Sequence, residues 1–293
     1  MKHDAHEPEG VLLVDKPAGP TSHDVVRDVR RALHTRAVGH TGTLDPFATG
    51  LLVVVVGRYT RLSPYLTDDD KEYEATIALG RSTTTDDPMG ETIETGDARA
   101  VSRAQVDDAL ATLRAQTTQR IPIFSAVRQD GERLYDRARR GDDVVAPERA
   151  VAIRSLTLLG FDDGHVAVRV VVSKGTYIRA IARDLGALVG CPAHCATLRR
   201  TRSGPYRVDD AIAARDLADR AAGALRVGPE AVPGLTPLPV DDVTRAAIAT
   251  GRRFAPPAPL DDGALALAHD GGSPLAVVQR EGETCRVVRG FGG

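Results

Sequence analysis

The sequence predicts an α+β protein built from one larger domain and a small, β-rich C-terminal module. Some segments, such as 166–172, place a valine at every second position, a pattern typical of strands. Others, such as 22–33, repeat apolar residues at helical spacing. A single hydrophobic core usually stops growing at roughly 250–300 residues. Two domains are therefore expected in a chain of 293 residues.

The N-terminal segment is expected to form a strand, a helix and a polar loop before a second strand. Residues 11–14 are a short apolar run that ends at a proline turn, which is typical of a buried strand. Ser22 is expected to cap a helix that ends near Leu33. The glycine-bounded loop 39–50, GHTGTLDPFATG, then leads into an aliphatic strand at 51–56.

The middle of the chain mixes strands with helices. Residues 72–79 alternate between apolar and polar side chains, which places Tyr73 on the buried face of a strand. The strand predicted at 166–172 runs directly into the polar segment SKGTYIR. Helices are expected at 102–114, at the arginine-rich segment 132–140 and at 176–189.

The C-terminal part changes in character. Residues 211–234 are rich in alanine and weakly patterned, which indicates a helix and a linker that close the larger domain. Beyond them, prolines separate three short apolar runs near Ala264, Pro274 and Thr284, as in a small β-rich module. The expected domains are therefore 8–234 and 235–293.

Composition narrows the class of protein. The N-terminus, MKHDAHEPEG, lacks the apolar core of a signal peptide, and the longest aliphatic run, 51–56, is far too short to span a membrane. Three cysteines make a disulfide framework unexpected and fit a reducing compartment. The sequence therefore predicts a cytoplasmic protein.

Arginines gather in three segments, 27–36, 133–140 and 199–207, although the formal net charge is only −2. Local basic faces on a nearly neutral protein suit phosphate contacts at chosen places. Solvated helix faces would have the same composition. The charge pattern by itself leaves both interpretations open.

Asp45 is a candidate catalytic carboxylate because it sits inside the glycine-bounded loop. An aspartate before a proline more often only forms a turn, so a catalytic role for Asp45 must be argued from the residues around it. Arg179 lies in the polar segment after a predicted strand. A buried Arg179 would need a carboxylate partner, and Asp45 would be ionised and aimed by it. Alternatively, Arg179 is an exposed residue of a first helical turn and Tyr177 merely packs.

No cofactor or metal is expected. Cys191, His194 and Cys195 supply only three ligands, and Cys285 is distant, so a structural zinc site is poorly supported. The loop 39–50 lacks the Gly-Lys-Ser/Thr ending of a P-loop. No GxGxxG motif follows a predicted strand, so a dinucleotide site is not indicated.

Five motifs together resemble the TruB-type tRNA pseudouridine-55 synthases. They are GVLLVDKPAGPTSHDVV, VGHTGTLDPFATGLLVV, KEYEATIALG, SKGTYIRAIARDLG and LRRTRSGPY, and they occur in that family's order across residues 10–207. The resemblance implies a pseudouridine synthase catalytic domain with a mixed, largely antiparallel sheet flanked by helices. It also implies a small PUA-like C-terminal domain and an RNA-gripping insertion at about 121–149.

The resemblance also implies roles for individual residues. Asp45 matches the catalytic aspartate, and Asp15 and Lys16 would hold the architecture around it. The substrate-binding residues would be His40, Tyr73, Tyr177, Arg179 and Leu198. His40 would help the target nucleotide to leave its stack, Tyr73 would stack on the uracil and Leu198 would form a wall of the uracil pocket. Tyr177 would contact the substrate, and Arg179 would pair with the catalytic carboxylate. Ile123 and Arg128 depart from the family's usual residues, outside this set.

The implied function is the isomerisation of uridine 55 in the T-loop of tRNA to pseudouridine, by base flipping and with no cofactor. The expected partner is the T-arm of tRNA, bound by a monomer without an obligatory protein partner. The sequence does not decide whether the aspartate attacks the sugar or removes the C2′ proton, nor whether Tyr73 is a base or only a platform. Two other functions stay open: a tRNA-binding folding chaperone, and a hydrolase, which would need a second acid.

Overall fold

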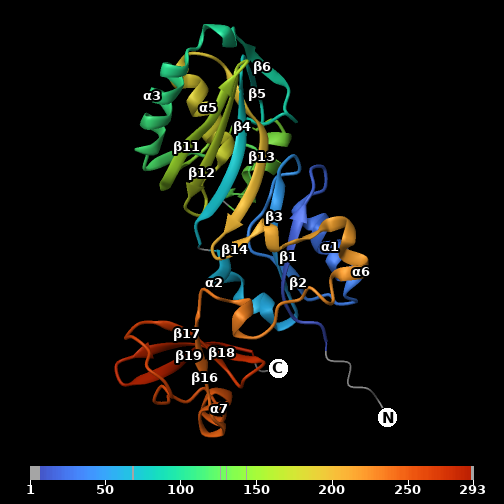
Figure 1. Cartoon of the computed structure of the whole chain (residues 1–293), viewed down its shortest axis with the longest axis vertical. Helices are drawn as coiled ribbons and strands as arrows, with labels where there is room; N and C mark the ends of the chain where they lie inside the picture. The colour runs from blue at the N-terminus through green and yellow to red at the C-terminus, as the bar shows by residue number, and fades with distance from the viewer. Residues whose placement is uncertain (1–6, 68, 126, 130, 143, 292–293) are drawn as a thin grey trace.

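A computed structural model of the chain describes residues 7–67, 69–125, 127–129, 131–142 and 144–291. The molecule is elongated, with a large sheet running through its upper and middle parts and a small sheet at its lower end (Figure 1). The large sheet has the order β11-β12-β4-β13-β3-β1-β15, with β14 beside β13 and β2 beside β3. Its strands are β1 (Gly10–Lys16), β2 (Val38–His40), β3 (Thr49–Val56), β4 (Lys71–Leu79), β11 (Ile153–Asp162), β12 (His165–Val172), β13 (Ala193–Ser203), β14 (Tyr206–Arg207) and β15 (Ile212–Ala213).

Most neighbouring strands of the large sheet are antiparallel. Parallel pairing occurs between β13 and β3 and between β1 and β15. The prediction of a mixed, largely antiparallel sheet is therefore confirmed. In β4 buried and half-buried residues alternate over the whole strand, with Tyr73 among the buried ones, as its sequence pattern predicts.

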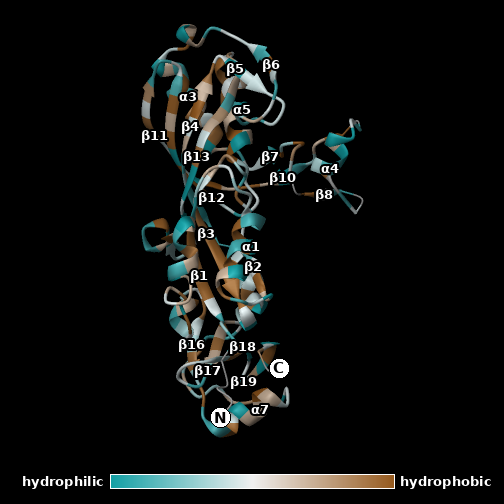
Figure 2. Cartoon of the chain, turned by 90° about the vertical axis from the view of Figure 1, so that its right-hand side faces the viewer, coloured by the Kyte–Doolittle hydropathy of each residue, from teal (hydrophilic) through white to brown (hydrophobic). Residues whose placement is uncertain are grey.

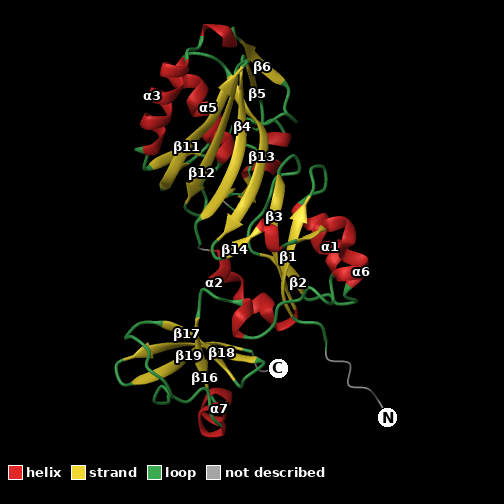
Figure 3. Cartoon of the chain, viewed as in Figure 1, coloured by secondary structure: helices red, strands yellow, loops and turns green. Residues whose placement is uncertain are grey.

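The helices, red in Figure 3, flank this sheet of yellow strands. In the upper part, α3 (Arg103–Arg114) and α5 (Ile178–Val189) lie together beside the sheet, and their apolar residues join one core with those of β4, β12 and β13 (Figure 1). In the middle part, α1 (Ser22–Ala32) and α6 (Leu217–Arg220) share a second core with β1 and β3. A short helix, α2 (Ser63–Thr67), precedes β4. Each described helix is too short or too polar to cross a bilayer.

An arm projects sideways from the body of the molecule (Figure 2). Its root is the antiparallel pair of β7 (Thr118–Arg120) and β10 (Glu148–Ala150). Farther out lie β8 (Arg128–Gln129), β9 (Glu132–Arg133) and α4 (Leu134–Arg139). Buried Ile121, Leu134 and Val144 form a small apolar cluster within the arm. The side chain of Arg128, one of the sequence departures, lies outside the described part.

Several predicted boundaries were wrong. Thr21, not Ser22, caps α1, and it forms a capping box with Asp24. The side chain of Ser22 is instead buried and bonded to Leu44. The helices predicted at 132–140 and 176–189 each begin two residues later than expected, at Leu134 and Ile178. Residues 211–234 form only the four-residue α6, β15 and short 3₁₀ turns.

Residues 236–290 form a four-stranded sheet of β16 (Thr236–Pro239), β17 (Leu265–His269), β18 (Pro274–Glu281) and β19 (Thr284–Gly290), with α7 (Asp242–Ala249). The three predicted apolar runs are β17, β18 and β19. Leu267, Val277 and Phe291 share one apolar cluster with β1 and β3, so this sheet packs on the larger part of the molecule. The boundary after residue 234 and the PUA-like identity of the module stay predictions.

The junction of β3 with β13 requires a glycine, and Gly50→Ala tests this. Gly50 has φ +99°, and an added Cβ would lie 2.3 Å from the carbonyl oxygen of Arg200. We expect the substitution to lower the free energy of unfolding by about 2–5 kcal/mol, from backbone strain and overpacking together. Urea unfolding followed by circular dichroism measures this loss.

Gly39→Ala is the matched control, because the added Cβ would meet its nearest neighbour, Val55, at an ordinary 3.7 Å. It should change the unfolding free energy by less than about 1 kcal/mol. Equal unfolding midpoints for the two variants would contradict this account of the junction.

Candidate active site

Asp45 lies in the loop between β2 and β3, and buried donors from outside the loop hold its backbone. The Ser22 hydroxyl accepts from the Leu44 amide at 2.8 Å and donates to the Leu44 carbonyl at 3.0 Å. The buried Arg200 guanidinium donates to the carbonyls of Gly42 at 3.0 Å and Thr43 at 3.4 Å. Because the carbonyls of an irregular loop lack ladder partners, these contacts keep the segment in one conformation.

Lys16 holds the next part of the loop. Its ammonium group is fully buried and donates to the carbonyls of Pro17 and Pro20 at 2.8 Å and of Pro46 at 3.3 Å. Burial lowers the pKa of Lys16 to about 8, which leaves it largely charged at neutral pH. Asp15, beside it, pairs with Arg199 at 2.8 Å. Lys16 therefore holds the loop at Pro46, next to Asp45, whereas Asp15 contacts Arg199 on β13. A role of both residues around the site stays a prediction.

Asp45 forms an ion pair with Arg179, which lies in the first turn of α5. The Arg179 Nε and the Asp45 Oδ2 are 2.9 Å apart, and the Arg179 Nη2 donates to Oδ1 at 3.3 Å. The Arg179 side chain is only 4% exposed, whereas that of Asp45 is 32% exposed. The arginine is thus a buried support, while the carboxylate stays accessible to a ligand.

The buried guanidinium has three further acceptors. Arg179 donates to the carbonyls of Thr85 at 2.7 Å and Phe124 at 3.0 Å, and its Nη1 lies 3.5 Å from the Asp87 Oδ2. The alternative of an exposed Arg179 was therefore wrong. A buried arginine needs this many acceptors because an unmet charge in the interior is costly.

Asp87 completes the support of Arg179 and was missed by sequence reasoning. Its carboxylate also accepts from the Thr85 hydroxyl at 2.5 Å and from the Met89 amide at 2.9 Å, which closes the turn between β5 (Arg81–Thr83) and β6 (Thr92–Thr95). The available signal is the run TTTDDP at 83–88, whose residues are typical of a turn.

Opposing effects set the pKa of Asp45. Burial has the largest effect and raises the pKa above its usual range, the Arg179 guanidinium lowers it, and the Asp87 carboxylate raises it again. The net direction is upward. Asp45 is therefore a more basic carboxylate than an ordinary aspartate, although it remains paired with a cation that is always charged.

Tyr73 and Leu198 lie near each other on the buried face of the sheet. Tyr73 on β4 and Leu198 on β13 are diagonal neighbours, because Leu198 is directly opposite Ala75. Both belong to the apolar cluster that includes Leu44 of the Asp45 loop. The structure thus brings an aromatic ring and an apolar side chain close to the segment that carries the carboxylate.

His40 ends β2, at the start of the same loop. Its ring meets that of His23 edge-on, with centroids 5.5 Å apart. Burial is the main cause that lowers the pKa of His40 to about 4, so the ring is neutral at physiological pH. Its buried Nδ1 has no hydrogen-bond partner among the described residues. The ring therefore brings no charge to the site, and its buried Nδ1 is not open to solvent.

Tyr177 precedes α5 and connects the arm with the site. The Gln119 side chain accepts from the Tyr177 amide at 2.8 Å and donates to its carbonyl at 3.1 Å. The ring packs against the apolar cluster of the arm, and burial raises the pKa of Tyr177. Gln119 on β7 therefore fixes the backbone from which Tyr177 and Arg179 extend.

The residues considered for zinc lie elsewhere and have other partners. Cys191, His194 and Cys195 are buried. The His194 Nδ1 lies 2.9 Å from the carbonyl of Arg81, to which it donates, and the Cys195 thiol donates to the carbonyl of Thr197. Within the described ranges, no group of three or more His, Cys, Asp or Glu side chains is arranged to hold a metal.

Comparisons with known proteins agree with the motifs. Residues 30–178 match the N-terminal domain of TruB family pseudouridylate synthases, and residues 179–226 match a tRNA pseudouridylate synthase B C-terminal domain. The chain is 39% identical to the tRNA pseudouridine synthase B of Corynebacterium efficiens, over 98% of this chain and 97% of the relative. It is 41% identical to that of Streptomyces avermitilis, over 97% and 98%.

Solved structures extend the comparison to the fold. One is an H/ACA ribonucleoprotein bound to a substrate RNA containing 2′-deoxyuridine, and another is a Cbf5-Nop10-Gar1 complex. In each, the matching chain is 26% identical with a TM-score of 0.73, over 97% of this chain and 85% of that chain. The likeness therefore extends over the small C-terminal sheet as well as the large one.

The electrostatic account of the site predicts the titration of Asp45. A carboxyl ¹³C titration by NMR should give Asp45 a pKa above the ordinary 3.8. Asp87→Asn should lower that pKa, because it removes the neighbouring negative charge with little change in shape. The exposed Asp219→Asn on α6 is the control and should leave it unchanged. An Asp45 pKa that does not respond to Asp87→Asn would refute the coupling.

Proposed function

Because this chain belongs to the TruB family of pseudouridylate synthases, we propose that it isomerises uridine 55 in the T-loop of tRNA to pseudouridine. The observation that carries this proposal is the accessible Asp45 carboxylate, held by the buried Arg179 in a loop whose carbonyls are bound from outside. This arrangement keeps the half-buried carboxylate partly accessible and fixed in orientation, as a reaction at a sugar carbon requires.

The chemistry needs a single carboxylate. Pseudouridine formation breaks the bond between N1 and C1′, turns the uracil and joins C5 to C1′. C5 loses its proton and N1 takes one up, so the product is an isomer of the substrate. No atom is oxidised or reduced and no group is transferred from another molecule, so the proposed reaction needs no cofactor. Asp45 either attacks C1′ or removes the C2′ proton, and both routes require its ionised form, which Arg179 favours.

The remaining site residues would hold the target base. A uridine inside a folded RNA loop must leave its stack before a carboxylate can reach its ribose. We infer that Tyr73 stacks on the flipped uracil and that Leu198 forms an apolar wall beside it. Neutral His40 would help the base to leave the stack, and Tyr177 would contact the substrate from the side of the arm.

The arm would bind the T-arm of the tRNA. It projects from the body next to the segment that carries Tyr177 and Arg179 (Figure 2), and its helix α4 carries arginines. We infer that the chain acts as a monomer without an obligatory protein partner, since its own arm would supply the grip on RNA. We also place its action in the cytoplasm, where the proposed substrate is used.

A tRNA-binding folding chaperone is the alternative function. Binding alone would not need Asp45 and Arg179, a pair whose burial costs desolvation energy. A hydrolase of glycosides would need a second catalytic acid near the first. Asp87 is the nearest acid described above, but it is buried and already bonded to Thr85, Met89 and Arg179, so it is not available as a proton donor.

Asp45→Asn separates catalysis from binding. It should lower the single-turnover rate of pseudouridine formation in a tRNA transcript by at least about 10³-fold, because the reacting carboxylate is lost. The affinity for tRNA should stay within about tenfold, because the amide keeps the shape of the side chain.

Mapping pseudouridine by position in wild-type reactions tests the proposed target. The exposed Asp97→Asn should retain full activity. A fully active Asp45→Asn variant would exclude the proposed mechanism.

Arg137→Ala tests the arm as an RNA-binding surface. Arg137 on α4 has no ion-pair partner among the residues that the structure describes, whereas Arg140 lies between Glu132 at 2.7 Å and Asp142 at 2.9 Å. We expect Arg137→Ala to weaken tRNA binding and to reduce the slope of log K against log salt by about 1. Arg140→Ala is the control and should change the slope less, since carboxylates already balance its charge. An unchanged slope for Arg137→Ala would remove this side chain from the interface.

A further inference from the structure

Arg183 lies one helical turn after Arg179 on α5 and has no part in the function proposed above. Its guanidinium joins three segments. The Nη1 is 3.4 Å from the Asp86 Oδ2, the Nη2 donates to the Arg120 carbonyl at 2.8 Å, and the Nε donates to the Asp184 Oδ1 at 3.0 Å. Arg183 therefore connects α5 both to the turn before β6 and to β7 at the root of the arm.

The connection to Asp86 supports the turn whose groups accept from Arg179. Arg179 and Arg183, four residues apart on one face of α5, bind successive groups of the same turn. Arg179 contacts the Thr85 carbonyl and Asp87, and Arg183 contacts Asp86 between them. The two arginines therefore hold one turn at two points, and the second point limits how far the turn can move away from Arg179.

Asp86 has a conformation that its surroundings must maintain. Its φ is +58°, in the left-handed region that non-glycine residues rarely adopt. Its carbonyl accepts from the Cys195 amide of β13 at 3.0 Å, while its carboxylate faces Arg183. Burial raises the pKa of Asp86 to about 6, so the carboxylate is mostly ionised at neutral pH. Arg183 supplies the countercharge for a residue held in a strained backbone position.

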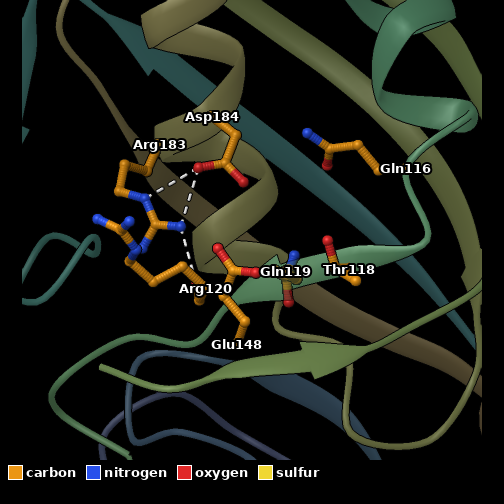
Figure 4. Close-up of a pocket in the computed structure, with 7 residues that line it drawn as sticks. All are labelled: Gln116, Thr118, Gln119, Arg120, Glu148, Arg183 and Asp184. Atoms are coloured by element: carbon orange, nitrogen blue, oxygen red, sulfur yellow. Dashed lines mark hydrogen bonds and ion pairs between the residues drawn. The ribbon is translucent and has the colours of Figure 1, made fainter. Parts of the chain in front are cut away.

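The second connection supports Tyr177. Arg183 binds the carbonyl of Arg120, the residue that follows Gln119 on β7. Gln119 in turn holds the backbone amide and carbonyl of Tyr177. Figure 4 shows Arg183 beside Arg120 and Asp184, with Gln119 on the same strand as Arg120. The strand that carries Gln119 is thereby fixed to α5, the helix that Tyr177 precedes.

We propose that Arg183 is a positioning residue that braces the turn at Asp86 and the strand β7 against α5, so that Arg179 keeps Asp45 aimed and Gln119 keeps Tyr177 in place. This inference rests on the proposed function and deepens it, because it assigns the geometry of the reacting pair to a residue that does not touch it. Through Arg183, the root of the arm at Arg120 is also connected to the turn that supports Arg179 and, through Arg179, to the Asp45 carboxylate.

The brace affects geometry more than global stability. Arg183 is 30% exposed and borders a polar, solvent-open cleft of about 320 Å³, lined by Gln116, Thr118, Gln119, Arg120, Glu148, Arg183 and Asp184 (Figure 4). Ion pairs in such places contribute little to folding. A small displacement of reacting groups can nevertheless slow a reaction by about 10²-fold. The loss of Arg183 should therefore appear in the rate rather than in folding.

Arg183→Met tests the brace with the full chain and a tRNA transcript. The single-turnover rate at saturating enzyme should fall by about 10–100-fold, while the dissociation constant for tRNA stays within about threefold. Arg183→Lys should recover only part of the rate, because an ammonium cannot reach three acceptors with the geometry of a guanidinium. The combined Arg183→Met and Asp86→Asn variant should lose less than the product of the single losses.

Arg154→Met is the matched control, because Arg154 on β11 also pairs with an aspartate, Asp70 at 3.2 Å, and is exposed. It should keep its rate within about twofold. Hydrogen exchange supplies a readout that does not depend on activity. Peptides covering 84–91 and 118–121 should exchange faster in Arg183→Met, whereas those covering β3 should not change.

The proposal would be wrong if Arg183→Met had a single-turnover rate within twofold of wild type. It would also be wrong if hydrogen exchange in 84–91 and 118–121 did not change. If rate, affinity and melting temperature all fell together, Arg183 would be a general stability residue and the proposal would also be wrong. A wild-type enzyme that forms no pseudouridine in tRNA would refute the proposed function, while hydrogen exchange would still decide whether Arg183 orders these segments.

Discussion

Arg179 is a permanently charged side chain placed in the interior, and its need for acceptors organises the site. Its partners come from segments far apart in sequence: Asp45 in the loop before β3, Thr85 and Asp87 in the turn before β6, and the Phe124 carbonyl at the start of the arm. Removing an acceptor from a buried guanidinium is costly, so these segments are held in one arrangement. Of the two carboxylates that contact Arg179, Asp45 has a side chain that is 32% exposed and Asp87 one that is 9% exposed, so Asp45 is the carboxylate that a ligand can reach.

The loop around Asp45 owes its shape to the same kind of interaction. It lacks a regular strand ladder, yet buried Lys16, Ser22 and Arg200 bind the carbonyls on both sides of Asp45. The carboxylate is thus held, partly accessible, on a fixed backbone, which a reaction at a single carbon atom demands. In the proposed function, contact with RNA belongs to a different element, the projecting arm, so binding and chemistry would rest on separate parts of the fold. Gln119 and Arg183 connect the two parts.

Local patterns in the sequence predict the helices and strands well, but they do not show which side chains meet in the folded protein. The alternation in β4 places Tyr73 on the buried face, and the glycines around Asp45 indicate its loop. The pairing of Arg179 with Asp45 was expected on the ground that a buried arginine needs a carboxylate. Arg200 and Asp87 were not assigned to the site, because they meet its groups only through the tertiary fold. Strand β16 was missed because its two prolines argue against a strand, but it lies at the edge of its sheet, where prolines are tolerated.

The central claim is that the Asp45 carboxylate, while paired with Arg179, is the group that reacts with the ribose of the target uridine. A crystal structure of the chain bound to a T-arm stem-loop tests it most directly. The account predicts that the uridine is turned out of its stack, that C1′ or C2′ of its ribose faces the Asp45 carboxylate, and that the ion pair with Arg179 is intact. A bound, everted uridine with Asp45 turned away from its ribose would contradict the account.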